Sequence, residues 1–230
     1  MQELITKANT LLEALPYIQR FAGATFVVKY GGSFMDSPDE AVRTGVARDV
    51  VFLEAVEINP VVVHGGGKRI SKTLKAAGVE SRFVNGLRYT DAATVEIVDR
   101  VLSQEVNAEI VDLINATGGE AKGFAGTDIF TCKKHAPAGE EYGFVGEVTG
   151  VNTAPLEECI ARGITPVISP PRAVTTGRFT TATPTSPPRK PPSRWPPSDW
   201  SSLVTCRGFF VTPMMPSLLY RIWTSRKSMN

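Results

Sequence analysis

Two apolar runs that end in glycines most restrict the folds open to this chain. They are VVKYGGS at 27–33 and VVVHGGGKR at 61–69, and a helical pattern follows each of them. A buried strand that passes through glycines into a helix is typical of sheets whose strands are parallel. Ligands of such sheets collect where the strands end. The sequence therefore predicts an α/β fold with its ligand site at these two turns.

Hydrophobic periodicity extends this pattern over the first 170 residues. Apolar stripes predict helices at 2–20, 38–57, 68–77, 91–117 and 153–162. Short apolar runs predict strands at 24–32, 60–67, 120–125, 129–134, 143–150 and 164–169. Pro16 is expected to kink or interrupt the first helix, and Ser37 to cap the second, with Pro38 at its first position. Strands that alternate with helices predict a largely parallel sheet.

The last 60 residues differ in composition from the rest of the chain. Residues 171–230 hold ten of the 17 prolines and a net charge of +8, whereas residues 1–170 carry −6. Proline at this density blocks both helix interiors and central strands. The composition predicts a basic, proline-rich tail at 171–230 that is disordered or irregular.

Composition also excludes several classes of function. The net charge of +2 predicts no strong field for nucleic acid. No apolar run reaches the ~18 residues that a membrane-spanning helix needs, and the N-terminus does not read as a signal peptide. The three cysteines, Cys132, Cys159 and Cys206, are too widely spaced for a disulfide framework or a metal cluster. We therefore expect no nucleic-acid or membrane partner, no bound structural metal and a cytoplasmic location.

The glycine turns favour phosphate chemistry. Each turn places free backbone N–H groups where a strand ends and a helix begins, which suits an anion. Neither turn has the glycine spacing of a dinucleotide fingerprint or a P-loop, so a plain turn remains the alternative. Lys29 lies in a strand two residues before Gly31. It could bridge transferring phosphates, or it could be a strand-end lysine that reaches water.

Few other side chains invite a chemical role. Arg88 lies in NGLRYTD, which is expected to be a polar loop before the long helix, with Thr90 or Asp91 as the helix cap. A guanidinium there could clamp a carboxylate or simply face solvent. His64 precedes three glycines on an apolar strand and is expected to be a packed core histidine. His135 is expected in an exposed loop, and neither histidine is assigned a role.

Taken in order, VVKYGGSFM, VVVHGGGKRI, NGLRYTD, the long helix and ITPVISP resemble the amino acid kinase family over about residues 1–170. The resemblance implies a three-layer α/β sandwich, here truncated, and transfer of the γ-phosphoryl group of ATP, with Mg²⁺, to the γ-carboxylate of N-acetyl-L-glutamate. It implies that Lys29 stabilises the transition state, that Gly31 and Gly32 hold phosphate, and that Gly66, Gly67 and Arg88 bind the amino-acid substrate.

The resemblance also divides the chain into three parts. Residues 1–22 would be an extra N-terminal helix of the oligomerisation type, which in similar family members joins dimers into a hexamer. Residues 23–170 would be the substrate-binding lobe, and 171–230 the tail. A homo-oligomer, either dimer or hexamer, is therefore expected of intact relatives.

The tail departs from the family pattern. After ISP the family continues with a Y-N-x-N-A-D segment and most of the nucleotide domain, and neither is present as written. If the reading frame shifted by one nucleotide near residues 170–172, 180–185 would permit Y-N-G-N-A-D and 205–210 would permit D-V-P-G-F-F. We therefore hypothesise a frameshifted tail, which the DNA around residues 168–175 tests. Since the family's catalytic aspartate and a second lysine belong to the missing part, we expect negligible transfer by this chain.

Three alternatives remain open at this level. The first is another carboxylate kinase of the same family, acting on aminoadipate or aspartate. The second is a non-catalytic fragment that binds N-acetyl-L-glutamate or pairs with intact subunits. The third is a genuine proline-rich tail whose PPRKPP segment at 187–192 binds SH3-type domains.

Overall fold

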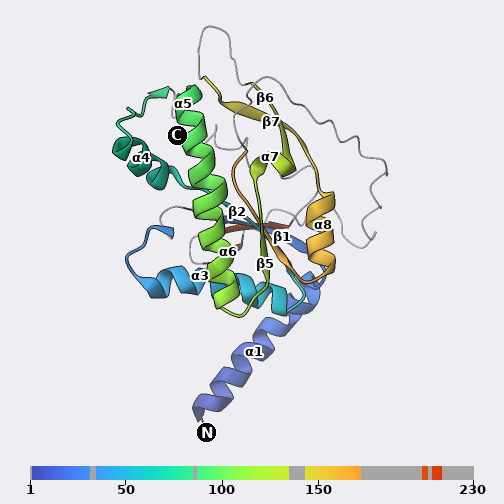
Figure 1. The fold of residues 1–230 in the computed structure, drawn as a ribbon. Helices are drawn as coiled ribbons and strands as arrows, with labels where there is room; N and C mark the ends of the chain where they lie inside the picture. The colour runs from blue at the N-terminus through green and yellow to red at the C-terminus, as the bar shows by residue number, and fades with distance from the viewer. Residues whose placement is uncertain are drawn as a thin grey trace.

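The computed structural model describes residues 2–31, 35–84, 87–134, 143–171, 204–206 and 209–213 (Figure 1). The helical elements are α1 (Gln2–Phe21), α3 (Glu40–Ala55), α4 (Gly67–Ala76), α5 (Ala92–Asp99), η1 (Arg100–Val106), α6 (Asn107–Ala116), α7 (Gly126–Ile129) and α8 (Ala154–Ala161). The strands are β1 (Thr25–Tyr30), β2 (Asn59–His64), β3 (Phe83–Val84), β4 (Leu87–Arg88), β5 (Ala121–Phe124), β6 (Phe130–Lys134), β7 (Gly146–Val151), β8 (Thr165–Ile168), β9 (Val204–Cys206) and β10 (Phe209–Pro213).

The main sheet has the strand order β5-β8-β2-β1-β10-β9. Its first four strands are parallel, as the sequence pattern predicted, and β1 pairs with β2 along its whole length, from Thr25 with Asn59 to Tyr30 with His64. Strand β10 adds to β1 in the antiparallel direction and β9 to β10. The carboxyl ends of the parallel strands therefore meet at one edge of the sheet.

Side chains of the sheet pack into a separate hydrophobic core on each face. Val28 and Val62 point to the face covered by α3, α4 and the long helix, whereas Val27 and Val61 point to the face covered by α8 and the β6–β7 hairpin. This division follows from the alternation of side chains along a strand. Figure 1 shows α6 on one side of β5 and α8 on the other. The three-layer α/β sandwich is confirmed.

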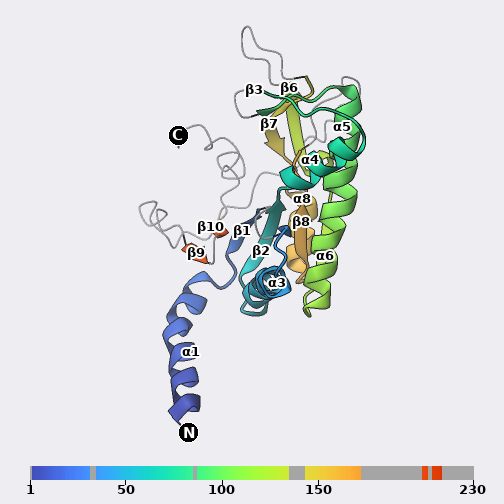
Figure 2. The same ribbon diagram turned by 90° about the vertical axis from the view of Figure 1, so that its left-hand side faces the viewer.

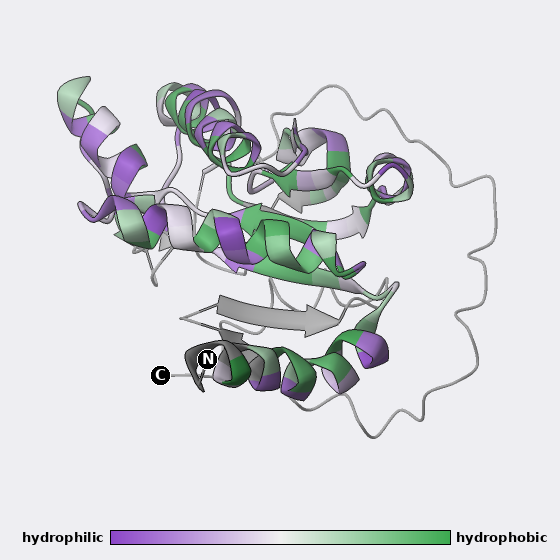
Figure 3. Cartoon of the chain, turned by 90° about the horizontal axis from the view of Figure 1, so that it is seen from below, coloured by the Kyte–Doolittle hydropathy of each residue, from purple (hydrophilic) through white to green (hydrophobic). Residues whose placement is uncertain are grey.

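Hydrophobic residues concentrate on the central strands and on the helix faces turned toward them, as Figure 3 shows from below. The largest fully buried side chains include Leu74 of α4, Ile114 of α6, Leu156 of α8 and Ile168 of β8. Burial of one such side chain stabilises the fold by about 1.5–3 kcal/mol. The helices are thus fixed to the sheet by the apolar stripes that predicted them.

Helix α1 is not interrupted at Pro16, and one helix begins later than the sequence predicts. Helix α1 continues through Pro16 to Phe21. Helix α3 begins at Glu40, with Asp39 rather than Ser37 as its N-cap, because the Asp39 carboxylate accepts a hydrogen bond of 2.9 Å from the amide of Ala41. Asp91 caps α5 by accepting from the amide of Thr94 at 2.8 Å, so one of the two candidate caps is selected.

The helix predicted over 91–117 is one helical stretch in three parts. The α-helical segments α5 and α6 enclose η1, a π-helix over Arg100–Val106. Such wider turns are rare and are found disproportionately at functional sites. Val101, Leu102 and Val106 of η1 are buried, so this segment packs directly against the sheet and the turn after β2.

The segment NGLRYTD was expected to be a polar loop, and this expectation was wrong for Arg88. Strands β3 and β4 form a two-stranded antiparallel hairpin in which Phe83 pairs with Arg88. The ladder continues outward, because the amide of Tyr89 donates to the carbonyl of Arg82 at 2.8 Å. Only two residues of each strand carry the period-2 signal, which is too short to recognise from sequence.

Two short strands of the tail belong to the main sheet. Strands β9 and β10 lie within the region expected to be irregular, and that expectation is corrected for these eight residues. Apart from Pro171, β9 and β10, the tail at 171–230 lies outside the described residues. In the part of the chain that the structure describes, no helix is long and apolar enough to cross a membrane.

Candidate functional site

The two glycine turns lie side by side at the carboxyl edge of the parallel sheet. Strands β1 and β2 end in register, with Lys29 opposite Val63 and Tyr30 opposite His64. The amide of Gly65 then donates a hydrogen bond of 3.0 Å to the carbonyl of Tyr30. Because this bond continues the ladder beyond the strands, both turns leave the sheet at the same level.

Lys29 is exposed although its strand neighbours are buried. It has the same parity as Val27, so its side chain lies on the α8 face of the sheet, beyond the apolar core of that face. Gly31 follows the last strand residue, Tyr30, and is partly exposed, and its carbonyl accepts from the amide of Met35 at 3.3 Å. Gly32, the other predicted phosphate-binding residue, lies outside the described residues.

Close packing explains why the second turn has glycine at position 66. Gly66 is buried, and a Cβ at this position would lie 2.6 Å from Cδ2 of Leu102 in the π-helical segment. Gly66 is also the N-cap of α4, and Gly67 opens that helix and is exposed. A glycine cap provides no side chain to bind the first amides of the helix, so these N–H groups suit an external anion. The predicted substrate residues Gly66 and Gly67 thus stand at a helix N-terminus.

Arg88 reaches this N-terminus from the hairpin. Its Nη2 donates to Oγ of Ser71 at 2.7 Å and to the carbonyl of Gly67 at 3.4 Å, and its Nη1 donates to Oγ of Ser81. The Ser71 hydroxyl in turn donates to the Gly67 carbonyl at 3.0 Å. Partial burial of Arg88 lowers the pKa of its guanidinium. The structure therefore brings three of the predicted residues together: Gly66, Gly67 and Arg88.

A buried polar network supports the same edge from inside. His64 is 3% exposed, and its Nδ1 lies 2.8 Å from the carbonyl of Gly65. Its Nε2 lies 3.2 Å from Nδ2 of Asn107, which also donates to the carbonyl of Val167 at 3.0 Å. Because the Asn107 amide is a donor, His64 is the Nδ1-protonated neutral tautomer that accepts at Nε2. His64 is thus a core residue, as predicted, and both of its ring nitrogens take part in hydrogen bonds.

The surroundings of His64 strongly favour the neutral form of its imidazole ring. Burial lowers the pKa of His64 to about 4, and the hydrogen bond to the Gly65 carbonyl opposes this shift only in part. A protonated ring would also turn Nε2 into a donor that faces the Asn107 amide donor. His64 therefore fixes the start of the glycine turn and is neutral near neutral pH.

Ser169 extends the buried polar groups beyond β8. Its hydroxyl lies 3.1 Å from Oγ of Ser103 on η1 and accepts from the amide of Gly126 at 2.9 Å. The amide of Ser169 donates to the carbonyl of Phe124 at 3.1 Å, so β5 and β8 remain paired at their ends. These contacts hold the π-helical segment against the carboxyl edge of the sheet.

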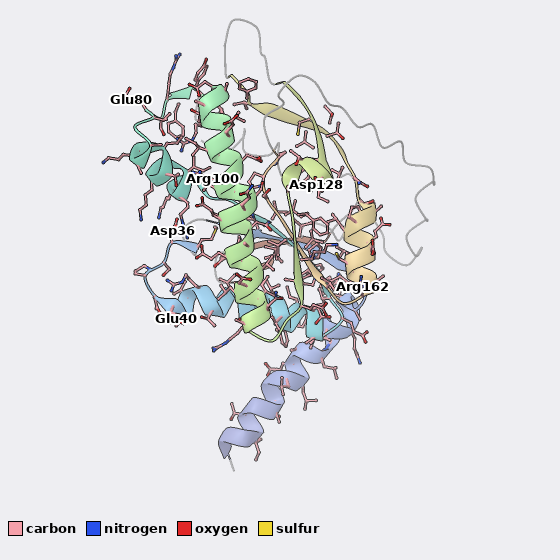
Figure 4. All side chains as sticks on the ribbon, in the orientation of Figure 1. Asp36, Glu40, Glu80, Arg100, Asp128 and Arg162 are labelled. Carbon is pink, nitrogen blue, oxygen red and sulfur yellow. The ribbon has the colours of Figure 1, made fainter. Side chains whose placement is uncertain are left out.

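An ion-pair cluster lies beside the turns. Nη2 of Arg69 is 2.7 Å from the Glu109 carboxylate, and its Nε is 3.9 Å from Asp36. Figure 4 shows Asp36 in the segment before α3, close to the long helix. Arg69 thus connects α4 and α6 to the segment that follows the first glycine turn. These groups are partly exposed, so the pairs contribute little to stability.

The described residues contain no group of three histidine, cysteine, aspartate or glutamate side chains that could hold a metal ion. Cys132 and Cys159 are buried free thiols. Burial raises the pKa of Cys132 to about 11 and also raises the pKa of Cys159. Both cysteines are core residues, and neither lies at the candidate site.

Comparison with known proteins identifies the family. The model of the amino acid kinase family matches residues 24–183. The chain belongs to the amino acid kinase family. Its core elements, from β1 to β8, all lie within the matched range, so the predicted resemblance is confirmed.

Curated relatives of this amino acid kinase family member are acetylglutamate kinases. The chain is 47% identical to that of Geotalea uraniireducens (strain Rf4) over 181 residues, which cover 74% of this chain and 61% of the relative. It is 49% identical to that of Thermosynechococcus vestitus over 172 residues, 75% of this chain and 58% of the relative. The chain thus spans about three fifths of the length of these relatives.

Solved structures agree on the fold. The N-acetylglutamate synthase of Neisseria gonorrhoeae matches 71% of this chain and 37% of its own, with a TM-score of 0.61 and 20% identity. Smu.665 from Streptococcus mutans UA159 matches 62% of this chain and 57% of its own, with a TM-score of 0.55 and 22% identity. At these identities the likeness concerns the fold of the amino acid kinase family alone.

Several residues at the site were not singled out by the sequence pattern. Ser71, Phe83, Ser103, Asn107 and Ser169 all take part in its contacts. One signal was available for Asn107, because it is a polar residue between Val106 and Ala108 on a predicted helix. The others contact the site through the hairpin and the sheet edge, which sequence spacing does not show.

Proposed function

We propose that this chain is the amino-acid-binding part of an acetylglutamate kinase, an enzyme that transfers the γ-phosphoryl group of ATP to the γ-carboxylate of N-acetyl-L-glutamate in arginine biosynthesis. One observation carries the proposal. The Arg88 guanidinium contacts the first turn of α4 through Ser71 and Gly67, so a fixed cation and a helix N-terminus converge on one place. Both groups favour an anionic ligand such as a dicarboxylate. The 44–49% identity to acetylglutamate kinases supports the same substrate.

Each predicted site residue then has a role that needs positioning and charge rather than a protein nucleophile. Arg88 binds the α-carboxylate of the amino acid, and the amides of Gly66 and Gly67 donate to it. Lys29 neutralises charge on the transferred phosphoryl group, and the turn at Gly31 and Gly32 holds phosphate oxygens. Phosphate oxygens of ATP are ligands that Mg²⁺ prefers, so the ion arrives with the nucleotide.

The chain as written is proposed to bind its amino acid without transferring phosphate. Residues 171–230 do not contain the Y-N-x-N-A-D segment of the family. When groups that act as a unit are removed, most of the rate enhancement is lost. Titration calorimetry with N-acetyl-L-glutamate, with and without Mg-ATP, and a coupled ADP-release assay together test this. Binding without turnover is expected, normal turnover contradicts inactivity, and absence of binding contradicts the proposed function.

Calorimetry can distinguish the proposed substrate from two other carboxylates of similar chemistry. N-acetyl-L-glutamate, free aspartate and an aminoadipate derivative all present a carboxylate to Arg88 and differ in length and in the N-acyl group. The same calorimetric titration with these three ligands decides between them. Tighter binding of aspartate or aminoadipate than of N-acetyl-L-glutamate would replace the proposed substrate by the corresponding carboxylate.

Substitution of Arg88 by alanine is expected to weaken binding of N-acetyl-L-glutamate about 10- to 100-fold, because a charge-assisted hydrogen bond contributes about 1.5–3 kcal/mol. Arg82→Ala is the matched control, since Arg82 is an exposed arginine of the same hairpin whose guanidinium lies over Tyr89. Calorimetric dissociation constants for both variants provide the comparison. An equal loss in both would assign the effect to overall charge rather than to the contacts of Arg88.

Helix α1 is proposed to mediate homo-oligomer formation. It projects from the body of the molecule (Figure 1), and its apolar side chains remain uncovered, with Leu11 66% and Leu12 64% exposed. A second copy of the helix could cover them. Light scattering measures the molar mass in solution, and a monomer would contradict this assignment.

A further inference from the structure

We propose that Phe83 is a positioning residue that holds the Arg88 guanidinium in the orientation that receives the substrate carboxylate. The inference rests on the proposed function and adds a specific residue to it. Phe83 and Arg88 are directly paired across the hairpin β3–β4. Cζ of Arg88 lies 4.6 Å from the centroid of the Phe83 ring, within the range of a cation–π interaction.

The exposure of Phe83 argues against a role in the core. Its side chain is 57% exposed, and it belongs to neither hydrophobic core of the sheet. A large apolar side chain gains little stability at such a position, because most of its surface remains in water. Its contact with the guanidinium is the one aromatic interaction that the structure records for this ring among the described residues.

The protein uses some of the hydrogen-bond donors of the Arg88 guanidinium and leaves others for a ligand. Ser81 accepts a hydrogen bond from Nη1, Ser71 and the carbonyl of Gly67 accept from Nη2, and the Phe83 ring lies against the guanidinium. Among the described residues, no carboxylate lies within ion-pair distance of Arg88, and burial is the only cause of its lowered pKa. An aromatic ring attracts the cation without consuming its charge in an ion pair. The remaining N–H groups and the positive charge are thus kept for an external anion.

The same hairpin provides a matched control. Cζ of Arg82 lies 5.1 Å from the centroid of the Tyr89 ring, and the backbone bond between these two residues makes them the next cross-strand pair. Side chains of successive pairs point to opposite faces of a hairpin. The Arg82–Tyr89 pair is therefore similar in chemistry and in its expected contribution to the hairpin, but it does not face α4. Figure 2 shows the hairpin at the same end of the molecule as α4 and α5.

The test compares Phe83→Leu, Phe83→Tyr and Tyr89→Leu by calorimetric titration with N-acetyl-L-glutamate, with chemical denaturation of each variant. Phe83→Leu keeps apolar bulk and removes the ring, and it is expected to weaken binding about two- to fivefold, the usual range for an exposed cation–π pair. Phe83→Tyr keeps the ring and is expected to restore the wild-type dissociation constant. Tyr89→Leu is expected to leave it unchanged.

Three results would overturn the inference. Phe83→Leu could bind as tightly as the wild type, or Phe83→Tyr could bind as weakly as Phe83→Leu. Equal losses in Phe83→Leu and Tyr89→Leu, with equal falls in stability, would assign the effect to the hairpin as a whole. Failure of the proposed function is distinguishable, because the wild type would then not bind N-acetyl-L-glutamate, whereas failure of this inference leaves wild-type binding and its loss in Arg88→Ala intact.

Discussion

Alanine in place of Gly126 is expected to lower the free energy of unfolding by about 3 kcal/mol, at the upper end of the cost of overpacking. A Cβ at Gly126 would lie 2.4 Å from the carbonyl oxygen of Pro170 and 2.6 Å from that of Ser169. These are backbone atoms directly after β8, so they cannot move away as a flexible side chain could. The added methyl group would also disturb the bond from the Gly126 amide to Oγ of Ser169.

Gly150→Ala is the matched control for this prediction. A Cβ at Gly150, in β7, would have the Cβ of Thr131 as its nearest neighbour at 3.6 Å, an ordinary contact. Alanine there should leave stability unchanged or raise it slightly, because it restricts the unfolded chain. Denaturant unfolding of the two variants and the wild type measures the difference. Equal stability of the two variants would show that the backbone after β8 is not packed as described.

Acid is expected to destabilise the fold through His64, by about 3 kcal/mol between pH 6.5 and 4. The ordinary pKa of histidine applies in the unfolded chain, whereas burial lowers the pKa of His64 to about 4 in the folded one. Between these values the unfolded chain binds the proton and the folded chain does not. Above pH 6.5 the ring is neutral in both states and the free energy of unfolding does not depend on its protonation. As the pH falls from 6.5 toward 4, protonation of the unfolded chain lowers the free energy of unfolding.

The titration of His64 can be measured separately, because the chain has only one other histidine, His135. In a His135→Gln background, NMR of the remaining imidazole follows His64 alone. The expected folded-state pKa is near 4, and the slope of unfolding free energy against pH between 4.5 and 6.5 should flatten when His64→Gln is added. A folded-state pKa of 6 or above would contradict the buried, neutral ring that accepts from Asn107.

The fold of residues 23–170 could be read from the sequence because its signals are local. Strands β1 and β2 are apolar runs that end in glycines, and the long helix has an apolar stripe along its length. The tight approach of Gly66 to Leu102 could not be read, since the two residues are 36 positions apart and only the packed structure brings them together. Burial patterns therefore predict elements better than they predict contacts.

Sequence motifs led to the proposed residues of the candidate site, but not to the residues that contact and support them. The glycines and Arg88 follow family-like motifs, whereas Ser71 and Phe83 contact Arg88 only because the hairpin β3–β4 folds back onto α4. A hairpin with two residues in each strand has no pattern of its own, and its position depends on tertiary packing. The same holds for Ser169, whose contact with Ser103 joins the end of β8 to the middle of the long helix.

The π-helical segment lets the long helix accept a change of length at one place. A π turn holds about one residue more than an α turn, so deleting one residue within Arg100–Val106 would restore ordinary α-helical winding and leave Asn107 facing His64. Deleting one residue early in α6 would instead rotate every later residue by about 100° about the helix axis, and Ile114 would leave the sheet. Single-residue deletions in the long helix should therefore be tolerated within η1 and not within α6.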